Sequence, residues 1–176
     1  MKKKLLLRKN LNKLVRSLFI MMFITGIAVN GYSQTIVSYK SRLQALDPSL
    51  AAHLKNLVTG LNPSVNLSKG EITTYGTGSP VVAISDAASV NQLFSNNPAF
   101  SQVELIRLTI TNAGEIPSAI DLLQMQGFNN LQYLLIVFGY DACGGSSDNC
   151  LSSKLGGIIQ GTSSPVIVLY DLSIPE

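Results

Sequence analysis

The chain has no tryptophan, a single histidine, two cysteines, and charged residues at only 13% of its 176 positions. With one histidine, a Ser-His-Asp arrangement would have to use His53, and no Gly-x-Ser-x-Gly turn presents a serine to it. The sequence also lacks a P-loop, a Gly-x-Gly-x-x-Gly fingerprint and a His-Glu-x-x-His helix. We therefore expect a non-enzymatic protein without a cofactor, in which His53 is a partly buried histidine with a backbone partner.

The positive charge of the chain is concentrated at its start. Of the 13 basic residues, 7 lie within residues 1–16, and a nearly uncharged apolar run of about 12 residues follows at 18–29. This layout is typical of a secretory signal peptide, and the run is shorter than the ~20 residues that cross a bilayer. We predict that residues 1–33 are a signal peptide, cleaved after Ser33. The alternative is an uncleaved signal anchor, because Gly31-Tyr32-Ser33 departs from the A-x-A pattern.

The remaining residues, 34–176, are predicted to form one secreted or periplasmic domain. They hold 6 basic and 10 acidic residues, a formal charge of −4, so the basic pI of the chain comes from the leader. Nucleic-acid binding requires clustered lysines and arginines, which this domain lacks. Membrane contact is expected only through the leader before cleavage.

Cys143 and Cys150 are the two cysteines of the chain, and a flexible Gly- and Ser-containing segment separates them. In an oxidising compartment this pair is expected to form a disulfide that pins a local loop. A redox role would need C-x-x-C spacing, and a metal site would need further ligands.

Hydrophobic periodicity predicts a small α/β domain. Leucines at spacings of three and four predict helix over 38–61, broken at Asp47-Pro48, where Asp caps a new helix and Pro occupies its first position. Residues 71–75 are expected to form a short strand in an edge hairpin. Beyond them, short β-branched runs alternate with helical segments, which predicts about four mainly parallel strands with right-handed crossovers. The expected strands are 81–85, 103–110, 131–138 and 166–170, and the expected helices are 87–95, 117–126 and 151–159.

Two of these strands share a pattern at an offset of 28 residues. Residues 100–108 and 128–136 both read F-x-x-[VL]-x-x-[IL]-x-[LI]. This pattern resembles the strand segment of leucine-rich repeats, L-x-x-L-x-L, over about residues 100–138. The resemblance implies a parallel repeat that serves as a binding scaffold, although Thr111 and Gly139 stand where that family usually has Asn after the strand.

The second face of the predicted sheet is too apolar to be left in water. Alternate strand positions on that face are Val82, Ile84, Leu105, Arg107, Tyr133, Leu135, Val137, Ile167 and Leu169. All but Arg107 are apolar or aromatic, and parallel sheets are normally covered on both sides. We therefore expect the leucine-rich N-terminal helices to cover this face.

Polar residues follow the predicted strands, at the edge where ligands gather in parallel α/β sheets. Asp86, Asp141 and Asp171 could share one rim and bind Ca²⁺ or Mg²⁺ through oxygen ligands, whereas the alternative is that each only caps its own turn. Thr111, Asn112 and Tyr140 are further candidate binding residues. The sequence thus favours an exported, non-enzymatic domain that binds a protein or glycan partner. The alternative is a metal-dependent hydrolase or a metal-assisted binding module.

Overall fold

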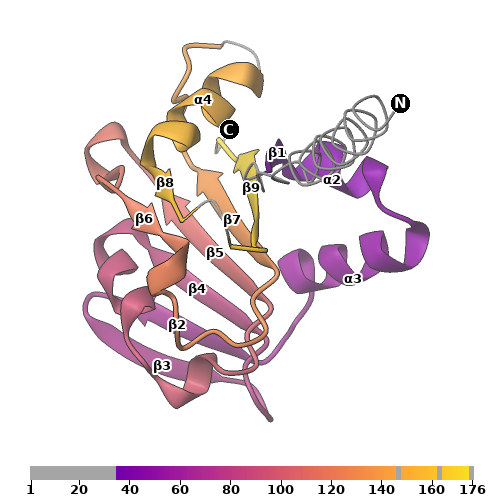
Figure 1. Ribbon diagram of the computed structural model, residues 1–176, viewed down its shortest axis with the longest axis vertical. Coiled ribbons are helices and arrows are strands. Elements are labelled where there is room, and N and C mark those ends of the chain that lie inside the picture. Colours follow the sequence, from indigo (N-terminus) through magenta and orange to yellow (C-terminus); the bar gives the residue numbers. More distant parts are fainter. Residues whose placement is uncertain (1–34, 146–147, 162–163, 175–176) are drawn as a thin grey trace, which may run out of the picture. The chain divides into compact units, whose positions relative to one another are not determined.

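The computed structural model describes residues 35–145, 148–161 and 164–174, so the predicted signal peptide and its cleavage point lie outside the described residues. None of the helices within these ranges is long and apolar enough to cross a bilayer. The described residues form an α/β fold around a 7-stranded, mainly parallel sheet (Figure 1). In that sheet, β2 and β3 are the antiparallel pair, and the other neighbouring strands run parallel.

The strand order across the sheet is β1-β9-β7-β5-β4-β2-β3. The strands are β1 (Ile36–Ser38), β2 (Ser64–Ser68), β3 (Glu71–Tyr75), β4 (Val82–Asp86), β5 (Leu105–Ile110), β7 (Tyr133–Phe138) and β9 (Ile167–Leu172). A separate pair joins β6 (Ile120–Asp121) to β8 (Ile159–Gln160). The predicted strands are confirmed as β4, β5, β7 and β9, and 71–75 is the outer strand of an edge hairpin. The predicted total of about four was too low, because β1 has three residues and β2, in which Val65 and Leu67 alternate with polar residues, lies in a segment rich in Ser and Asn.

Three α-helices and several 3₁₀ segments connect the described strands. They are α2 (Tyr39–Ala45), α3 (Pro48–Thr59), α4 (Asp148–Ile158), η1 (Ala87–Phe94), η2 (Pro98–Phe100), η3 (Ala113–Glu115) and η4 (Leu122–Gln124). The break at Asp47-Pro48 is confirmed, since the Asp47 carboxylate accepts hydrogen bonds from the backbone N–H groups of Ser49 and Leu50. The predicted third helix is confirmed as α4.

The predicted helix over 117–126 is wrong. This segment contains β6 and the short η4 instead, and the Asp121 side chain accepts a hydrogen bond from the Leu123 backbone N–H at 3.0 Å. Asp favours such local turns over a continuing helix, because its side chain competes for backbone donors. The predicted helix at 87–95 is present, but as the 3₁₀ segment η1.

The direction of each connection explains which face its helix covers. From β4 through β5 and β7 to β9 the chain moves steadily across the sheet, whereas the connection from β1 to β2 moves the opposite way. Right-handed crossovers that travel in opposite directions lie on opposite faces. Accordingly, α2 and α3 cover one face, which we call the α3 face, and η1, η4 and α4 cover the other, the crossover face.

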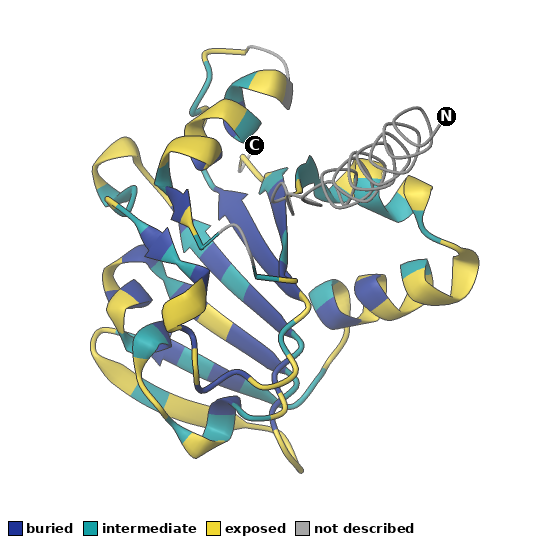
Figure 2. Ribbon diagram, viewed as in Figure 1, coloured by how far each residue is buried: buried dark blue, intermediate teal, exposed yellow. Residues whose placement is uncertain are grey.

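Alternate residues of the strands supply two separate cores. Figure 2 shows β7, inside the sheet, buried along its whole length. On the crossover face, buried side chains extend from Val65 in β2 to Tyr170 in β9. On the α3 face, Leu54 and Leu57 of α3 pack on Val82, Leu105, Tyr133, Leu135, Val137 and Leu169. The expected covering of the second face is therefore confirmed for the part of the sheet between β5 and β9.

The 28-residue offset seen in the sequence is present in space. Ile106 pairs with Leu134 across β5 and β7, and the rings of Phe100 and Phe128 stack with their centroids 4.5 Å apart. Asn130 donates a hydrogen bond to Gln102 at 3.0 Å, again between residues 28 apart. Equivalent positions thus lie side by side, while the leucine-rich-repeat resemblance itself stays a prediction.

Candidate functional site

At the carboxyl ends of β1, β9 and β7, the chain leaves neighbouring strands toward opposite faces of the sheet. Ser38 ends β1 and caps α2, which packs on the α3 face, whereas β7 is followed by α4 on the crossover face. Between them, β9 ends without a following helix in the described residues. In open α/β sheets a crevice outside the strand ends at such a point is the usual ligand site.

A cavity of about 460 Å³ opens at this point. This volume is within the range of small-ligand sites. Its polar lining residues are Ser38, Lys40, Ser41, Gln44, Asp141 and Asp171, and the remaining lining comes mainly from Ala142, Cys143, Leu151 and Leu172. We call this cavity the edge crevice.

The edge crevice holds charges of both signs that are not paired with each other. Lys40 is exposed, and the one ion pair in the described ranges joins His53 to Glu104, away from the crevice. Asp171 is half-buried and lies close to Tyr39, whose pKa is raised first by burial and second by the negative charge of Asp171. An acceptor at Asp171 and a donor at Lys40 are both free for a ligand.

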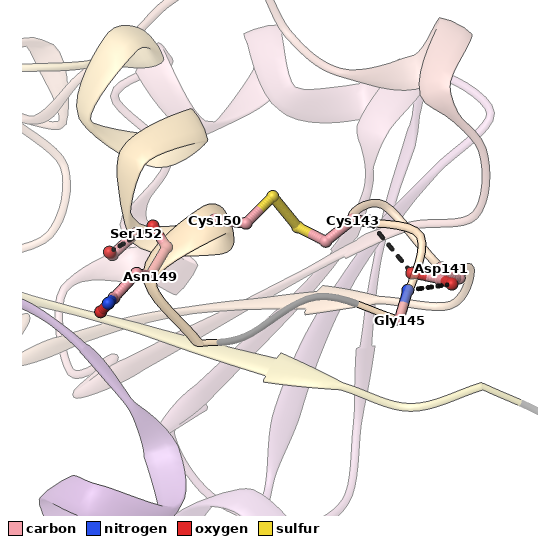
Figure 3. Close-up of a disulfide and its surroundings, with 6 residues drawn as sticks. All are labelled: Asp141, Cys143, Gly145, Asn149, Cys150 and Ser152. Atoms are coloured by element: carbon pink, nitrogen blue, oxygen red, sulfur yellow. Dashed lines mark hydrogen bonds between the residues drawn. A yellow bond between two sulfur atoms is a disulfide. The ribbon is translucent and has the colours of Figure 1, made fainter.

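Asp141 is held by the loop that the disulfide closes (Figure 3). Its two carboxylate oxygens accept hydrogen bonds from the backbone N–H groups of Cys143 at 3.0 Å and Gly145 at 2.7 Å. The predicted disulfide between Cys143 and Cys150 is present and joins this loop to α4. Because disulfides persist in oxidising compartments, the bond agrees with a location outside the cytoplasm.

The three predicted metal ligands are not brought together. In the strand register, Asp86 lies opposite Thr109 of β5, and Asp171 lies opposite Val137 of β7. Thr109 and Val137 lie opposite each other. Asp86 and Asp171 thus occupy one row of the sheet three strands apart, or about 14 Å at ~4.8 Å per strand. In the part of the chain that the structure describes, no three His, Cys, Asp or Glu side chains are grouped to hold a metal. The metal-assisted alternative therefore depends on Asp141 and Asp171 alone.

Asp86 has a local role that accounts for its position. Its carboxylate accepts hydrogen bonds from the Ser89 backbone N–H and the Ser68 hydroxyl, both at 2.8 Å, and so caps η1 and joins it to β2. Burial acts to raise the pKa of Asp86, but the hydrogen bonds from Ser89 and Ser68, with one from the backbone of Lys69, outweigh it and lower the pKa.

The predicted binding residues Thr111, Asn112 and Tyr140 lie around Glu115, which the sequence analysis did not single out. Glu115 accepts hydrogen bonds from the Thr111 backbone N–H at 2.7 Å, the Thr111 hydroxyl, and the Asn112 amide at 2.7 Å. The backbone bond from Thr111 is the main reason that the pKa of Glu115 is lowered. Tyr140 packs edge-on against Phe138, and its pKa is raised by burial and then by Glu115. The polar groups of Thr111 and Asn112 are thus engaged within their own turn.

His53 lies at the opposite, amino-terminal edge of the strands. Its Nε2 is 2.8 Å from Glu104 Oε2, and the side chain is 46% exposed. The Gln132 amide donates to the same carboxylate oxygen at 3.2 Å. The expected backbone partner was wrong, because Glu104 precedes β5 directly beneath α3, and no sequence pattern links residues 51 positions apart.

Comparison with protein-family models, curated proteins and solved structures finds no match to this chain. The function of the candidate site is therefore inferred from its geometry alone.

Sequence reasoning missed Lys40, Ser41 and Gln44 as residues of the site. Their positions follow from β1, which pairs in parallel with β9 through residues Ile36–Ser38. One local signal exists: Ser38 follows two β-branched residues and caps the helix, accepting a hydrogen bond from the Ser41 backbone N–H at 3.1 Å. A short strand followed by a helix cap would have placed Lys40 beside the strand ends.

Proposed function

We propose that the chain is an exported, non-enzymatic binding domain and that the edge crevice holds part of a glycan partner. The observation that carries the proposal is the crevice of about 460 Å³ at the carboxyl edge, with unpaired Lys40 and Asp171 in its lining. The leader of residues 1–33 and the disulfide support a secreted or periplasmic location.

The chemistry of the lining favours a ligand rich in hydroxyl groups. Carboxylates at Asp141 and Asp171 accept hydrogen bonds, Lys40 donates them, and Ser41 and Gln44 can do either. Charge-assisted hydrogen bonds are roughly twice as strong as neutral ones, so the carboxylates would orient a sugar.

The test is binding of the purified chain to immobilised oligosaccharides and immobilised peptides measured side by side. We expect binding to an oligosaccharide that Asp171→Asn and Lys40→Ala each weaken by about tenfold, the cost of one lost charged hydrogen bond. Glu71→Gln and Lys55→Ala are the matched controls, because both residues are exposed and lie outside the crevice. Binding to peptides alone, or glycan binding that is equal in all variants, would contradict the proposal.

A further inference from the structure

Besides the edge crevice, the protein has a hollow on the α3 face, over the strands that α3 does not cover. A recess of about 300 Å³ lies between the end of α3 and strands β2, β4 and β5, and we call it the face recess. Its lining is mixed, with apolar walls from Leu57, Val58, Leu61, Val82 and Ile84 and polar groups from Thr59, Asn62, Ser64 and Arg107. Leu61 is fully exposed and Ile84 is 37% exposed, so apolar surface faces solvent here.

Arg107 lies in the face recess without a partner. It occupies the middle of β5, paired with Ile84 on one side and Leu135 on the other. Its Nε is shielded from solvent and makes no hydrogen bond, and the ion pair found among the described residues does not include it. A guanidinium that is partly buried between apolar neighbours without a carboxylate is unfavourable by itself.

The acidic residues of the domain do not compensate for this charge. Residues 34–176 contain 10 acidic side chains, yet none in the described ranges lies within ion-pair distance of Arg107. The sequence also isolates Arg107, as the one charged position on an otherwise apolar strand face. The recess therefore combines a free cation with apolar walls.

We propose that the face recess binds a small carboxylic acid with an apolar tail. The carboxylate would pair with the guanidinium of Arg107, whose fork of N–H donors matches two carboxylate oxygens. The tail would lie against Val58, Leu61 and Ile84 and remove their exposed surface from water. The volume, about 300 Å³, is at the lower end of ligand pockets and suits a molecule of about ten heavy atoms.

Arg42 supplies a matched control. Its Nε is also buried and unpaired, but it lies on α2 and lines neither the face recess nor the edge crevice. The variants Arg107→Met and Arg42→Met remove the same charge and keep a long apolar side chain. Only the first should change binding in the recess.

The experiment titrates the purified chain with octanoate, octanol and inorganic phosphate and follows the backbone amide signals of residues 57–61 and Ile84 by NMR. We expect octanoate to bind the unaltered chain and Arg42→Met with similar affinity, about millimolar or tighter. Octanol and phosphate should each bind the unaltered chain at least tenfold more weakly than octanoate does. Octanoate should bind Arg107→Met at least tenfold more weakly than it binds the unaltered chain. Thermal unfolding serves as the second measurement, and Arg107→Met should unfold at the same or a higher temperature, because it removes an unpaired buried donor.

Two kinds of result would overturn the proposal. In the first, octanoate at 10 mM does not shift these signals of the unaltered chain, which would mean that it does not bind in the recess. Alternatively, phosphate binds as tightly as octanoate, which would mean that the apolar walls contribute nothing. In the second, Arg107→Met retains octanoate binding, or unfolds at a lower temperature than the unaltered chain, which would show that Arg107 has a structural role. The edge crevice takes no part in either measurement.

Discussion

The two faces of the sheet are built from alternate residues of the same strands, yet they are covered very differently. The crossover face carries a continuous core from β2 to β9, under several short segments and α4. The α3 face is buried mainly from β5 to β9, under a helix with two buried residues, Leu54 and Leu57. Toward β2 and β3 the same face becomes polar, with Ser64 and Asn66 in β2 and the mostly exposed β3 (Figure 2).

This difference shows where the molecule has room for ligands. The edge crevice is lined by residues of α2, and the face recess by the end of α3 and the segment after it. Both cavities therefore adjoin the α2–α3 crossover, the thinner of the two covers. The crossover face, whose buried side chains form the larger cluster, supplies stability, and the α3 face supplies the candidate binding surfaces.

The largest expected effect is on the core of the crossover face. Phe100 is fully buried and stacked on Phe128, so Phe100→Ala should lower the free energy of unfolding by about 3–5 kcal/mol. Leu54→Ala, on the α3 face, should cost about 2–3 kcal/mol, because the single helix that covers this face can shift toward the sheet and fill part of the space. Urea denaturation of both variants checks the order. A cost for Leu54→Ala above that for Phe100→Ala would make the α3 face the main core.

The disulfide gives an intermediate effect and tests the edge where the two faces meet. Replacing Cys143 and Cys150 with Ser reopens a loop of about 8 residues, and the chain-entropy estimate is a loss of about 2.5 kcal/mol. Thermal unfolding with and without reductant measures it, with the unaltered chain plus reductant as the matched control. If the double variant unfolds like the oxidised protein, the bond does not stabilise the loop that holds Asp141.

Local features could be predicted from the sequence, whereas features that join distant segments could not. The helix break at Asp47-Pro48 and the pairing of Cys143 with Cys150 depend on residues close together in the chain, and both are confirmed. The adjacent strands β5 and β7 were visible through their shared pattern. The helix predicted over 117–126 failed because the Asp121 side chain caps a short turn in the middle of the segment.

The candidate sites show the same division. Asp141 and Asp171 were predicted to share an edge, and they line one crevice, but Lys40 reaches it only because β1 pairs with β9 from more than 120 positions away. Asp86 lies apart because strand order, which one sequence does not reveal, places two strands between β4 and β9. Arg107 stood out by composition, while the recess around it depends on where α3 ends.

The smallest expected effect compares the helix caps of the two faces. Asp86 caps η1 on the crossover side and Asp47 caps α3, so Asp86→Ala and Asp47→Ala should each cost about 1 kcal/mol at pH 7. Because the pKa of Asp86 is lowered in the folded protein, its contribution is fully present above the unfolded value of about 3.9 and is lost as the pH falls through the lower folded pKa. The difference in unfolding free energy between the unaltered chain and Asp86→Ala should therefore shrink between pH 5 and pH 2. Urea denaturation across that range measures it, and a difference that stays constant or grows on acidification would mean that the ionised carboxylate does not hold η1 to β2.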